Sequence, residues 1–319
     1  MPSQAGQSKY RKLCQEHFIP IHSQDWWLDA VCGADGWGAT VLYNKAGDAI
    51  FACPYAIMRR YGQTMLKNPP LTTYLHPWVQ FPEGQSSVQQ HGYLHRLIKE
   101  WEESLPPAAL HSFMLNPSWE NGMAFHRVGY ELGVRYTYFL ENLEKEERVW
   151  AGIKTAIRTK IRRAQKEIRV EASRDFEAFF TIIERSFQQN KLGLPISKSQ
   201  LLQLLQLLEL KQKGTVYLAK DKAGRVHAGA LVLIDEGRAY YSLSGSDSNI
   251  RQSGATETLI WHILQDCLAK NYQSFDFEGS MAPNVEPVFR YFGGKLTPYL
   301  HVQHYKTPWM RWIQFLRAR

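Results

Sequence analysis

Hydrophobic and polar positions alternate along this chain in a pattern that occurs twice. Residues 40–53 show a strand, a turn and a second strand, and residues 215–229 show the same arrangement. Each turn carries the sequence Lys-Ala-Gly, at residues 45–47 and 222–224, and a glycine there favours a tight connection between antiparallel strands. The pattern predicts two matching β-hairpins.

Three further pairs of elements follow the hairpins in the same order. They are long helices with one apolar face after Gln85 and Gln252, short strands at 112–116 and 274–278, and short helices ending at 125–130 and 289–294, each leading into a Tyr-rich strand at 136–140 or 299–304. Corresponding positions lie 162 to 177 residues apart, a drift that loops can absorb. Four matches in one order predict an internal duplication.

A duplicated α/β (α+β) unit also agrees with the length of the chain, because 319 residues exceed an ordinary single core. We expect two tandem domains, each a mixed twisted sheet flanked by helices. The expected parts are a disordered N-terminus at 1–9, an N-terminal domain at 10–147, a C-terminal domain at 148–306 and a C-terminal amphipathic helix at 307–319. That last helix is basic and Trp-rich, which suits peripheral contact with a membrane surface. Packing back against the domain is the alternative.

Composition narrows the class of protein further. No stretch reaches the run of about 18 apolar residues that a membrane span needs, and the first residues lack the pattern of a signal peptide. We therefore expect a cytoplasmic protein. The four cysteines have no C-x-x-C spacing and the histidines form no metal-spaced cluster, so we expect neither disulfides nor a metal.

The net charge of +8 is concentrated in one segment. Residues 154–169 hold seven basic residues and one acid, which leaves about +2 for the rest of the chain. Arg158, Arg162 and Lys166 follow at intervals of four, with Arg163 beside them, so a helix here has a uniformly cationic face. Such a face suits the phosphates of a nucleotide, coenzyme A, tRNA or anionic lipid. The alternative is a solvated helix face.

The order of elements in each half resembles the GNAT acyltransferase fold, and the tandem arrangement resembles FemAB-type proteins. In GNAT proteins acyl-coenzyme A enters a wedge between two strands, and the start of a helix, marked Gln/Arg-x-x-Gly-x-Gly/Ala, holds its pyrophosphate. The second half matches this motif at its first and fourth positions and departs at Thr256. The resemblance implies a cofactor-binding turn made of Arg251, Gln252, Ser253, Gly254 and Ala255. Residues 85–90 of the first half lack the glycine.

Several local segments also resemble FemAB-like proteins. They are the basic stretch 157–167, Leu194-Pro195, the stretch 275–280 and Phe292-Gly293-Gly294. FemAB proteins transfer an amino acid from aminoacyl-tRNA to a peptidoglycan precursor. The resemblance implies a transfer of an acyl group from acetyl-coenzyme A, another acyl-coenzyme A or aminoacyl-tRNA to an amine of a small molecule or cell-wall precursor. The second half would carry the cofactor cleft and the first half would shape the acceptor site.

Four residues are candidates for the chemistry itself. Asp276 and Glu278 lie at positions i and i+2 of a strand and so share one face, where one could act as base. Arg290 and Tyr291 are candidates for substrate contact. FemAB-type proteins carry a lysine, and many GNAT enzymes a tyrosine, near the position that is Phe289 here.

A rival hypothesis of another class assigns the chain no catalysis. A non-catalytic protein could keep the doubled fold and bind nucleotide-linked ligands or nucleic acid through residues 154–169. Asp276 and Glu278 would then only satisfy backbone groups at the strand end, and Arg290 and Tyr291 would be structural.

Overall fold

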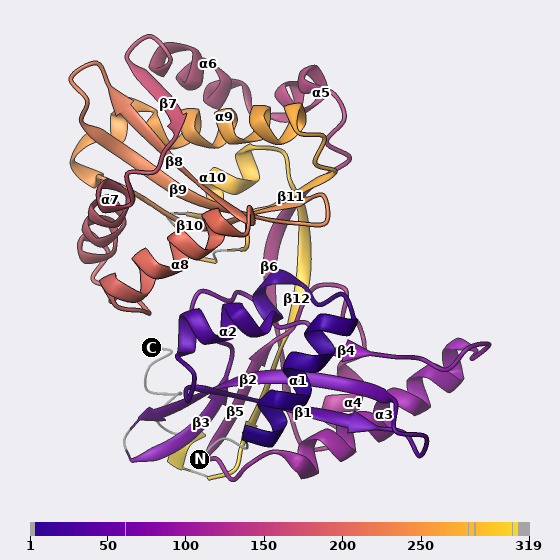
Figure 1. Cartoon of the computed structure of the whole chain (residues 1–319). Coiled ribbons are helices and arrows are strands. Elements are labelled where there is room, and N and C mark those ends of the chain that lie inside the picture. Colours follow the sequence, from indigo (N-terminus) through magenta and orange to yellow (C-terminus); the bar gives the residue numbers. More distant parts are fainter. Residues whose placement is uncertain (1–3, 61, 280, 284, 308, 312–319) are drawn as a thin grey trace. The chain divides into compact units, whose positions relative to one another are not determined.

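A computed structural model of the chain describes residues 4–60, 62–279, 281–283, 285–307 and 309–311, without the side chains of Arg251 and Gln252. The chain forms two compact units (Figure 1). Unit 1 comprises Met1–Arg135 and Pro298–Arg319, and unit 2 comprises Tyr136–Thr297. Each unit contains a mixed sheet with helices on it, which confirms the expected fold class.

Unit 1 holds the elements of the first half and most of the last strand. Its helical segments are α1 (Gln4–Glu16), η1 (Ile21–Ser23), α2 (Asp25–Cys32), α3 (Ser87–Ser104) and α4 (Gly122–His126). Its strands are β1 (Trp37–Tyr43), β2 (Ala49–Arg60), β3 (Gln63–Lys67), β4 (Trp78–Val79), β5 (Leu110–Met114), the start of β6 (Glu131–Glu141) and most of β12 (Lys295–Tyr305). The strand order is β1-β2-β3-β5-β12, with β4 beside β2. Only the pair β3 and β5 is parallel among these.

Both faces of this sheet are covered because its side chains alternate. Phe51 of β2 packs with Trp101 of α3, whereas the next residue, Ala52, packs with Leu13 of α1. Helix α3 starts at a capping box, in which Ser86 and Gln89 each satisfy a backbone N–H of the other. The predicted apolar face of this helix is the buried one.

Unit 2 repeats the arrangement of unit 1. Its helical segments are α5 (Glu146–Gly152), α6 (Thr155–Ala164), α7 (Phe176–Gln189), α8 (Lys198–Leu210), η2 (Ser248–Ser253), α9 (Ala255–Ala269) and α10 (Glu286–Tyr291). Its strands are β7 (Ile168–Ala172), β8 (Gly214–Asp221), β9 (Val226–Asp235), β10 (Arg238–Ser246) and β11 (Ser274–Asp276), with the end of β6. The order is β6-β11-β10-β9-β8-β7. Again one pair is parallel, β10 and β11.

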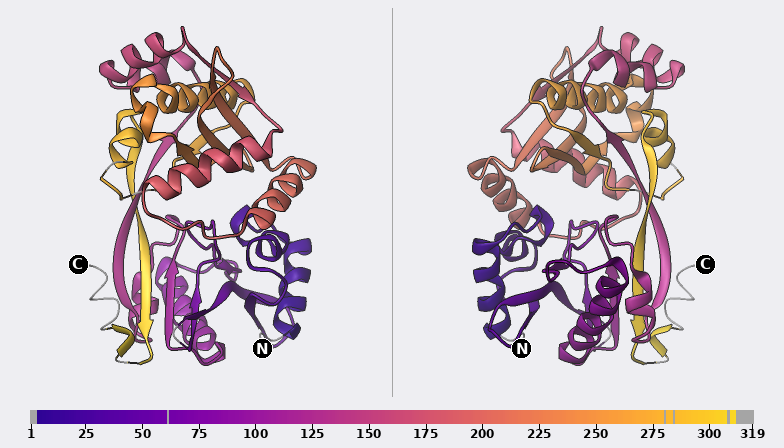
Figure 2. Two further views of the ribbon diagram at one scale, coloured as in Figure 1. Left: turned by 90° about the vertical axis from the view of Figure 1, so that its left-hand side faces the viewer. Right: turned by 90° about the vertical axis from the view of Figure 1, so that its right-hand side faces the viewer.

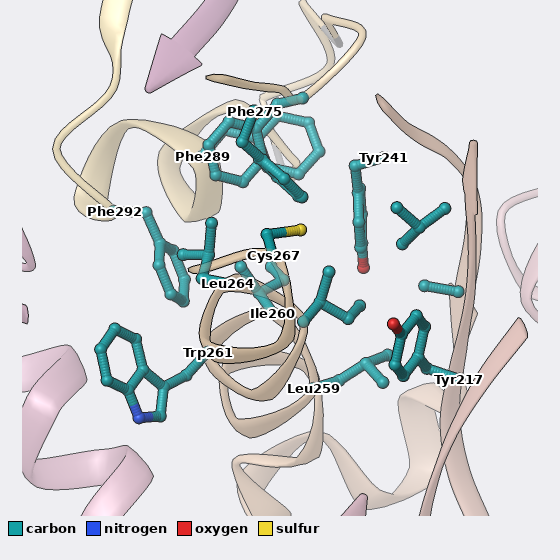
Figure 3. Packing of buried hydrophobic residues seen from close by; sticks show 14 of the residues in the cluster. Tyr217, Tyr241, Leu259, Ile260, Trp261, Leu264, Cys267, Phe275, Phe289 and Phe292 are labelled. Atoms are coloured by element: carbon teal, nitrogen blue, oxygen red, sulfur yellow. The ribbon is translucent and has the colours of Figure 1, made fainter. Parts of the chain in front are cut away.

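The two faces of the unit 2 sheet carry different helices (Figure 2). Helix α9 packs on one face through Leu259, Ile263 and Cys267, among a core that is drawn in Figure 3. Helix α7 packs on the other face, where Phe179 and Ile182 lie against Gly229 of β9. A Cβ at position 229 would come within 3.0–3.1 Å of these side chains, so the glycine permits the close contact.

The two predicted hairpin turns are built in the same way. In the first, Oδ1 of Asn44 accepts hydrogen bonds from the backbone N–H groups of residues 46 and 48, each 2.9 Å long. In the second, Oδ1 of Asp221 accepts from residues 223 and 225, each 3.0 Å long. Both turns contain a glycine with positive φ, Gly47 and Gly224. The duplication therefore extends to single hydrogen bonds.

The closing strand of each half joins the sheet of the other half. Strand β6, which ends the first half, pairs with β11 in unit 2. Strand β12, which ends the second half, pairs with β5 in unit 1. The compact units are therefore divided at Arg135 and at Thr297, whereas the sequence repeat is divided near Val149.

The two ends of the chain differ in part from expectation. Residues 4–9, expected to be disordered, belong to α1, because Tyr10 and Leu13 on the same helix are buried against β1 and β2. In the expected C-terminal helix, residues 309–311 are helical and Met310 packs in unit 1 with Met65 and Leu110. Residues 308 and 312–319 lie outside the described residues, so membrane contact through this helix stays a prediction.

Candidate functional site

The candidate site lies where two parallel strands of unit 2 part. Strand β10 pairs with β11 only from Arg238 to Tyr240, and β10 continues to Ser246 without that partner. The register of β10 with β9 also shifts between Tyr241 and Leu243, which marks a bulge. Ligands of open α/β sheets bind beyond the carboxyl ends of the strands, where such a separation leaves room.

A cavity of about 260 Å³ occupies this place. Residues of several elements line it: Tyr241, Ser244 and Ser246 of β10, Ala255, Thr256 and Glu257 of α9, Lys160 of α6, Ser186 of α7, and Val288 and Phe289 of α10. The wall therefore carries both hydroxyl groups and apolar side chains. Such a mixture suits an acyl group on a polar carrier.

The turn that leads into α9 contains the glycine of the predicted cofactor-binding segment. Gly254 has φ +73°, a left-handed conformation, and helix α9 begins at the next residue. A Cβ on Gly254 would lie 2.8 Å from the Cβ of Ala164, so α6 also requires a glycine here. Of the predicted cofactor-binding residues, Ser253 and Ala255 line the cavity. The side chains of Arg251 and Gln252 lie outside the described residues.

Asp247 holds the loop between β10 and α9 in place. Its carboxylate accepts hydrogen bonds from Arg185 at 2.9 Å, from Gln189 at 3.0 Å and from the backbone N–H of Asn249 at 3.0 Å. The bonds from Gln189 and Asn249 lower the pKa of Asp247, and Arg185 adds to this, against the effect of burial. Helix α7 thereby fixes the wall of the cavity.

The predicted phosphate-binding residues have different surroundings, and the expected helix is shorter than the basic segment, because α6 ends at Ala164, before Lys166. Arg158 donates a hydrogen bond to Thr155, and the guanidinium of Arg162 lies 5.3 Å from the ring centre of Trp150. Lys166 is exposed. Arg163 instead lines a second cavity of about 730 Å³.

This second cavity adjoins the first, because both are bordered by Lys160, His227 and Ser253. The ammonium group of Lys160 is 2.7 Å from a carboxylate oxygen of Glu257, a residue of the first turn of α9. The acid at this helix start is thus partly neutralised by a lysine that the sequence pattern did not distinguish from its neighbours.

Asp276 and Glu278, the predicted carboxylate pair, are both buried. Oδ1 of Asp276 accepts hydrogen bonds from Thr137 Oγ1 at 2.8 Å and from the backbone N–H of Glu278 at 2.9 Å. Burial, and then the charge of Glu278, raise the pKa of Asp276 well above the ordinary aspartate value. Asp276 is the register partner of Tyr240, so it faces away from the side on which Tyr241 borders the cavity.

Arg290 and Tyr291, the candidate residues on α10, contact side chains of their own unit. Arg290 forms an ion pair with Glu286 at 3.1 Å, and Tyr291 lies beneath the ammonium group of Lys154, 4.1 Å from its ring centre. Phe289, which is labelled in Figure 3, packs 4.8 Å from Phe277 between ring centres and borders the cavity. The position where relatives carry lysine or tyrosine is therefore an apolar part of the wall.

His227 is a cavity residue that the sequence did not single out. It is the second residue of β9, is 7% exposed, and borders both cavities. Its Nε2 lies 3.0 Å from Oδ2 of Asp221, across the hairpin turn. A single histidine in a strand belongs to no motif. Only the predicted hairpin, which brings this histidine beside Asp221, could have indicated it.

Residues 152–291 match the family described as an acetyltransferase (GNAT) domain. The match runs from the end of α5 to the end of α10 and so contains both cavities. Over these residues the predicted resemblance to GNAT acyltransferases is confirmed.

Solved structures extend the likeness to the whole chain. The crystal structure of FemX is similar over 92% of this chain and 95% of that chain, with a TM-score of 0.64 and 11% sequence identity. The structure of L-PGS from Bacillus licheniformis is similar over 96% of this chain and 93% of that chain, with a TM-score of 0.56 and 12% identity. These likenesses show a shared fold. No curated protein sequence matches the chain.

Two absences concern the residues that the structure describes. Among them, no helix has the length and apolar character needed to cross a bilayer. The same residues bring together no group of three histidine, cysteine, aspartate or glutamate side chains that could hold a metal ion.

Proposed function

We propose that this protein is an N-acyltransferase that moves an acyl group from a phosphate-bearing carrier to an amine. The observation that carries the proposal is the cavity of about 260 Å³ at the start of α9, inside the residues that match the GNAT domain. The acyl group would lie along β10, beside Tyr241 and Ser244, where the strands part.

The donor's phosphates would lie at the start of α9. Backbone N–H groups at a helix start favour an anion, and helix α9 begins directly after Gly254. Lys160 and Arg163 border the adjoining second cavity and can hold further phosphates. Acyl-coenzyme A and aminoacyl-tRNA both offer this combination of acyl group and phosphates, and FemAB-like chemistry favours an amine of a small molecule or cell-wall precursor as acceptor.

The proposal predicts binding of the donor and formation of an amide. Acetyl-coenzyme A, or a charged tRNA, should raise the melting temperature of the protein by several degrees. It should also be consumed with a panel of amines, with the amide detected by mass spectrometry. If neither donor raises the melting temperature or reacts with any amine, while inorganic polyphosphate still stabilises the protein, the rival polyanion-binding function replaces this one.

A second pair of variants tests the predicted carboxylates. Asp276→Asn and Glu278→Gln remove the only two acids proposed from the sequence as bases. If turnover of both variants equals that of the wild type, neither acid is the base. Asp276 is the register partner of Tyr240 and so faces away from Tyr241, which leads us to expect this result for Asp276→Asn.

Charge reversal on α6 separates the two cationic faces. Arg163→Glu should weaken donor binding about tenfold or more, because Arg163 borders the second cavity. Arg162→Glu, directed at the side chain that stacks on Trp150, should change donor binding less than Arg163→Glu. If both variants weaken donor binding equally, the donor binds to a diffuse basic surface and not specifically at the second cavity.

A further inference from the structure

We propose that His227 is the general base of the acyl transfer and that Asp221 is its positioning residue. The inference rests on the proposed function, because a base is required only if an amine attacks an acyl group. The amine nitrogen must lose a proton as it forms its new bond. Phe289, at the position where relatives carry a polar side chain, cannot accept it.

The position of His227 meets the first requirement for a base, which is access to the cavity from a fixed place. The residue is 7% exposed and borders both cavities of the site. Its backbone C=O accepts a hydrogen bond from the N–H of Asp247 at 3.1 Å, so His227 is attached to the loop that leads into α9. Phe289 borders the same cavity.

The hydrogen bonds of Asp221 determine which nitrogen of His227 carries the proton. Oδ1 of Asp221 accepts from the backbone N–H groups of Ala223 and Arg225, and Oδ2 accepts from Arg225 Nε at 2.7 Å. The bond with His227, and then Arg225, lower the pKa of Asp221 against the effect of burial, so its carboxylate stays ionised. A carboxylate can only accept, and therefore His227 donates from Nε2.

The other ring nitrogen is then the basic one. With the proton on Nε2, Nδ1 of neutral His227 carries a lone pair. This atom is buried and has no hydrogen-bond partner among the side chains that the structure describes. Buried polar atoms are almost always satisfied, so an unsatisfied ring nitrogen on a residue that borders both cavities points to a partner that arrives with a ligand.

The charged groups that border the two cavities with His227 come from five segments. Lys160 and Arg163 lie on α6, Glu167 between α6 and β7, Asp221 and Arg225 at the β8–β9 turn, Asp247 directly after β10 and Glu257 on α9. Most are paired with each other, with Lys222 or with Arg185, for example Lys160 with Glu257 and Arg225 with Asp221. Acidic and basic side chains thus occur beside His227 in nearly equal numbers.

The step conserves atoms and charge. The acceptor nitrogen attacks the acyl carbonyl carbon, the C–N bond forms, and Nδ1 of His227 takes one amine proton. The bond from the acyl carbon to the carrier's sulfur or oxygen then breaks. The proton on His227 passes to that leaving group or to water, and the products are an amide and the free carrier.

The test compares His227→Gln with His262→Gln in full-length protein. His262 is a half-buried histidine of α9 that contacts Tyr217 and serves as the matched control. We expect His227→Gln to lower kcat about 100-fold or more, with the donor KM changed less than threefold. The wild-type rate should fall toward acid pH as His227 takes a proton, and the variant should lack that limb. His262→Gln should keep both rate and profile.

Asp221→Asn provides a second, independent variant. Its Oδ1 can still accept from the turn, but its amide group would donate to Nε2 and place the ring proton on Nδ1, where the base is needed. We expect a fall in kcat of at least tenfold. Added imidazole should partly restore turnover to His227→Ala, and a structural role would not give this rescue.

The outcomes separate this inference from the function on which it rests. A wild-type protein that binds donor but acylates no amine contradicts the proposed function. A wild-type protein that does acylate, together with unchanged kcat and pH profile in His227→Gln, overturns only the role of His227. A rise in donor KM at unchanged kcat would make His227 a phosphate-binding residue and would also overturn it.

Discussion

Two aspartates beside the candidate site hold backbone groups in place through their carboxylates. Asp221 bonds two N–H groups of its turn, and Asp247 bonds one N–H of its loop. Both carboxylates also bond side chains from other segments, His227 and Arg185. A change of one such residue therefore alters both a local turn and the wall of the candidate site.

Gly254 provides a prediction at this scale. In Gly254→Ala the new Cβ would meet Ala164 at 2.8 Å in a backbone conformation of φ +73°. We expect a loss of about 1–3 kcal/mol in the free energy of unfolding and weaker donor binding. Gly92→Ala, in open space on α3, should instead stabilise by about 0.5–1 kcal/mol. Urea unfolding measures both, and equal stability of the two variants would contradict the close contact.

Asp276 gives a prediction with a defined pH dependence. Its pKa is raised well above the ordinary value, so the folded state holds this proton more tightly than the unfolded state. The contribution of Asp276 to stability therefore falls as the pH rises above about 4 and through the raised pKa. Asp276→Asn keeps the oxygen that accepts a hydrogen bond from Thr137. Its free energy of unfolding at pH 8 should exceed that of the wild type by about 1 kcal/mol or more.

This advantage should shrink when unfolding is measured at pH 4. Asp35→Asn, at an exposed position, should show no comparable difference at either pH. A destabilised Asp276→Asn at pH 8 would mean that the carboxylate form is the favoured one.

The sequence predicted some residues of the site and not others, for a physical reason. Ser253, Gly254 and Ala255 were predicted because the resemblance marks a helix start by a short local motif, and Ser253 and Ala255 border the cavity. His227 and Asp221 were not found, since their partnership exists only after the hairpin has formed. Glu278 shows the same limit, because its φ of +51° depends on the surrounding fold.

At the scale of elements, a buried cluster attaches strand β12 to helix α3. One carboxylate oxygen of Glu102 on α3 lies 2.5 Å from Nζ of Lys306 and 3.3 Å from Nδ1 of His304, and the other forms hydrogen bonds with His111 and Tyr130. Burial alone would raise the pKa of Glu102, but the hydrogen bonds from His111, Lys306 and Tyr130 lower it to about 2. The cluster therefore holds β12, a strand from the far end of the chain, beside α3.

Glu102→Gln should weaken this attachment by about 2 kcal/mol or more at pH 7. Because the folded pKa is lowered, the contribution of Glu102 is complete above about pH 4.3 and is lost as the pH falls toward 2. The gap between wild type and variant in thermal unfolding should close over that range. Glu103→Gln, 65% exposed on the same helix, should differ from the wild type by about 0.5 kcal/mol or less.

Most elements were predictable because their signals are local. The hairpins, the apolar face of α3 and the glycine turns follow from neighbouring residues. That β6 and β12 each join the sheet of the other half was not predictable. Alternation along a strand indicates which face is buried, but not which sheet supplies the neighbouring strands.

At the scale of the whole molecule, the exchange makes unit 1 discontinuous in the chain. Strand β12 covers the edge of β5 and contributes Val302 to the core of unit 1. Neither unit is therefore encoded by one half of the sequence, although each half has a complete pattern of elements.

A chain that ends after Thr297 tests this. It lacks the part of β12 that belongs to unit 1, so we expect unit 1 to be digested in limited proteolysis while unit 2, residues 136–297, resists. A chain that ends after Arg311 keeps β12 and should resist as the full protein does. Equal resistance of both truncated chains would show that unit 1 does not need this strand.

The exchanged strands also set an order for assembly on the ribosome. Domains usually fold as they are synthesised, starting with the N-terminal one. Here unit 2 has all its residues once position 297 has emerged, whereas unit 1 must wait for residues 298–305. We therefore expect unit 2 to fold first. Unit 1, although most of it is translated earlier, would keep an open strand edge until residues 298–305 arrive.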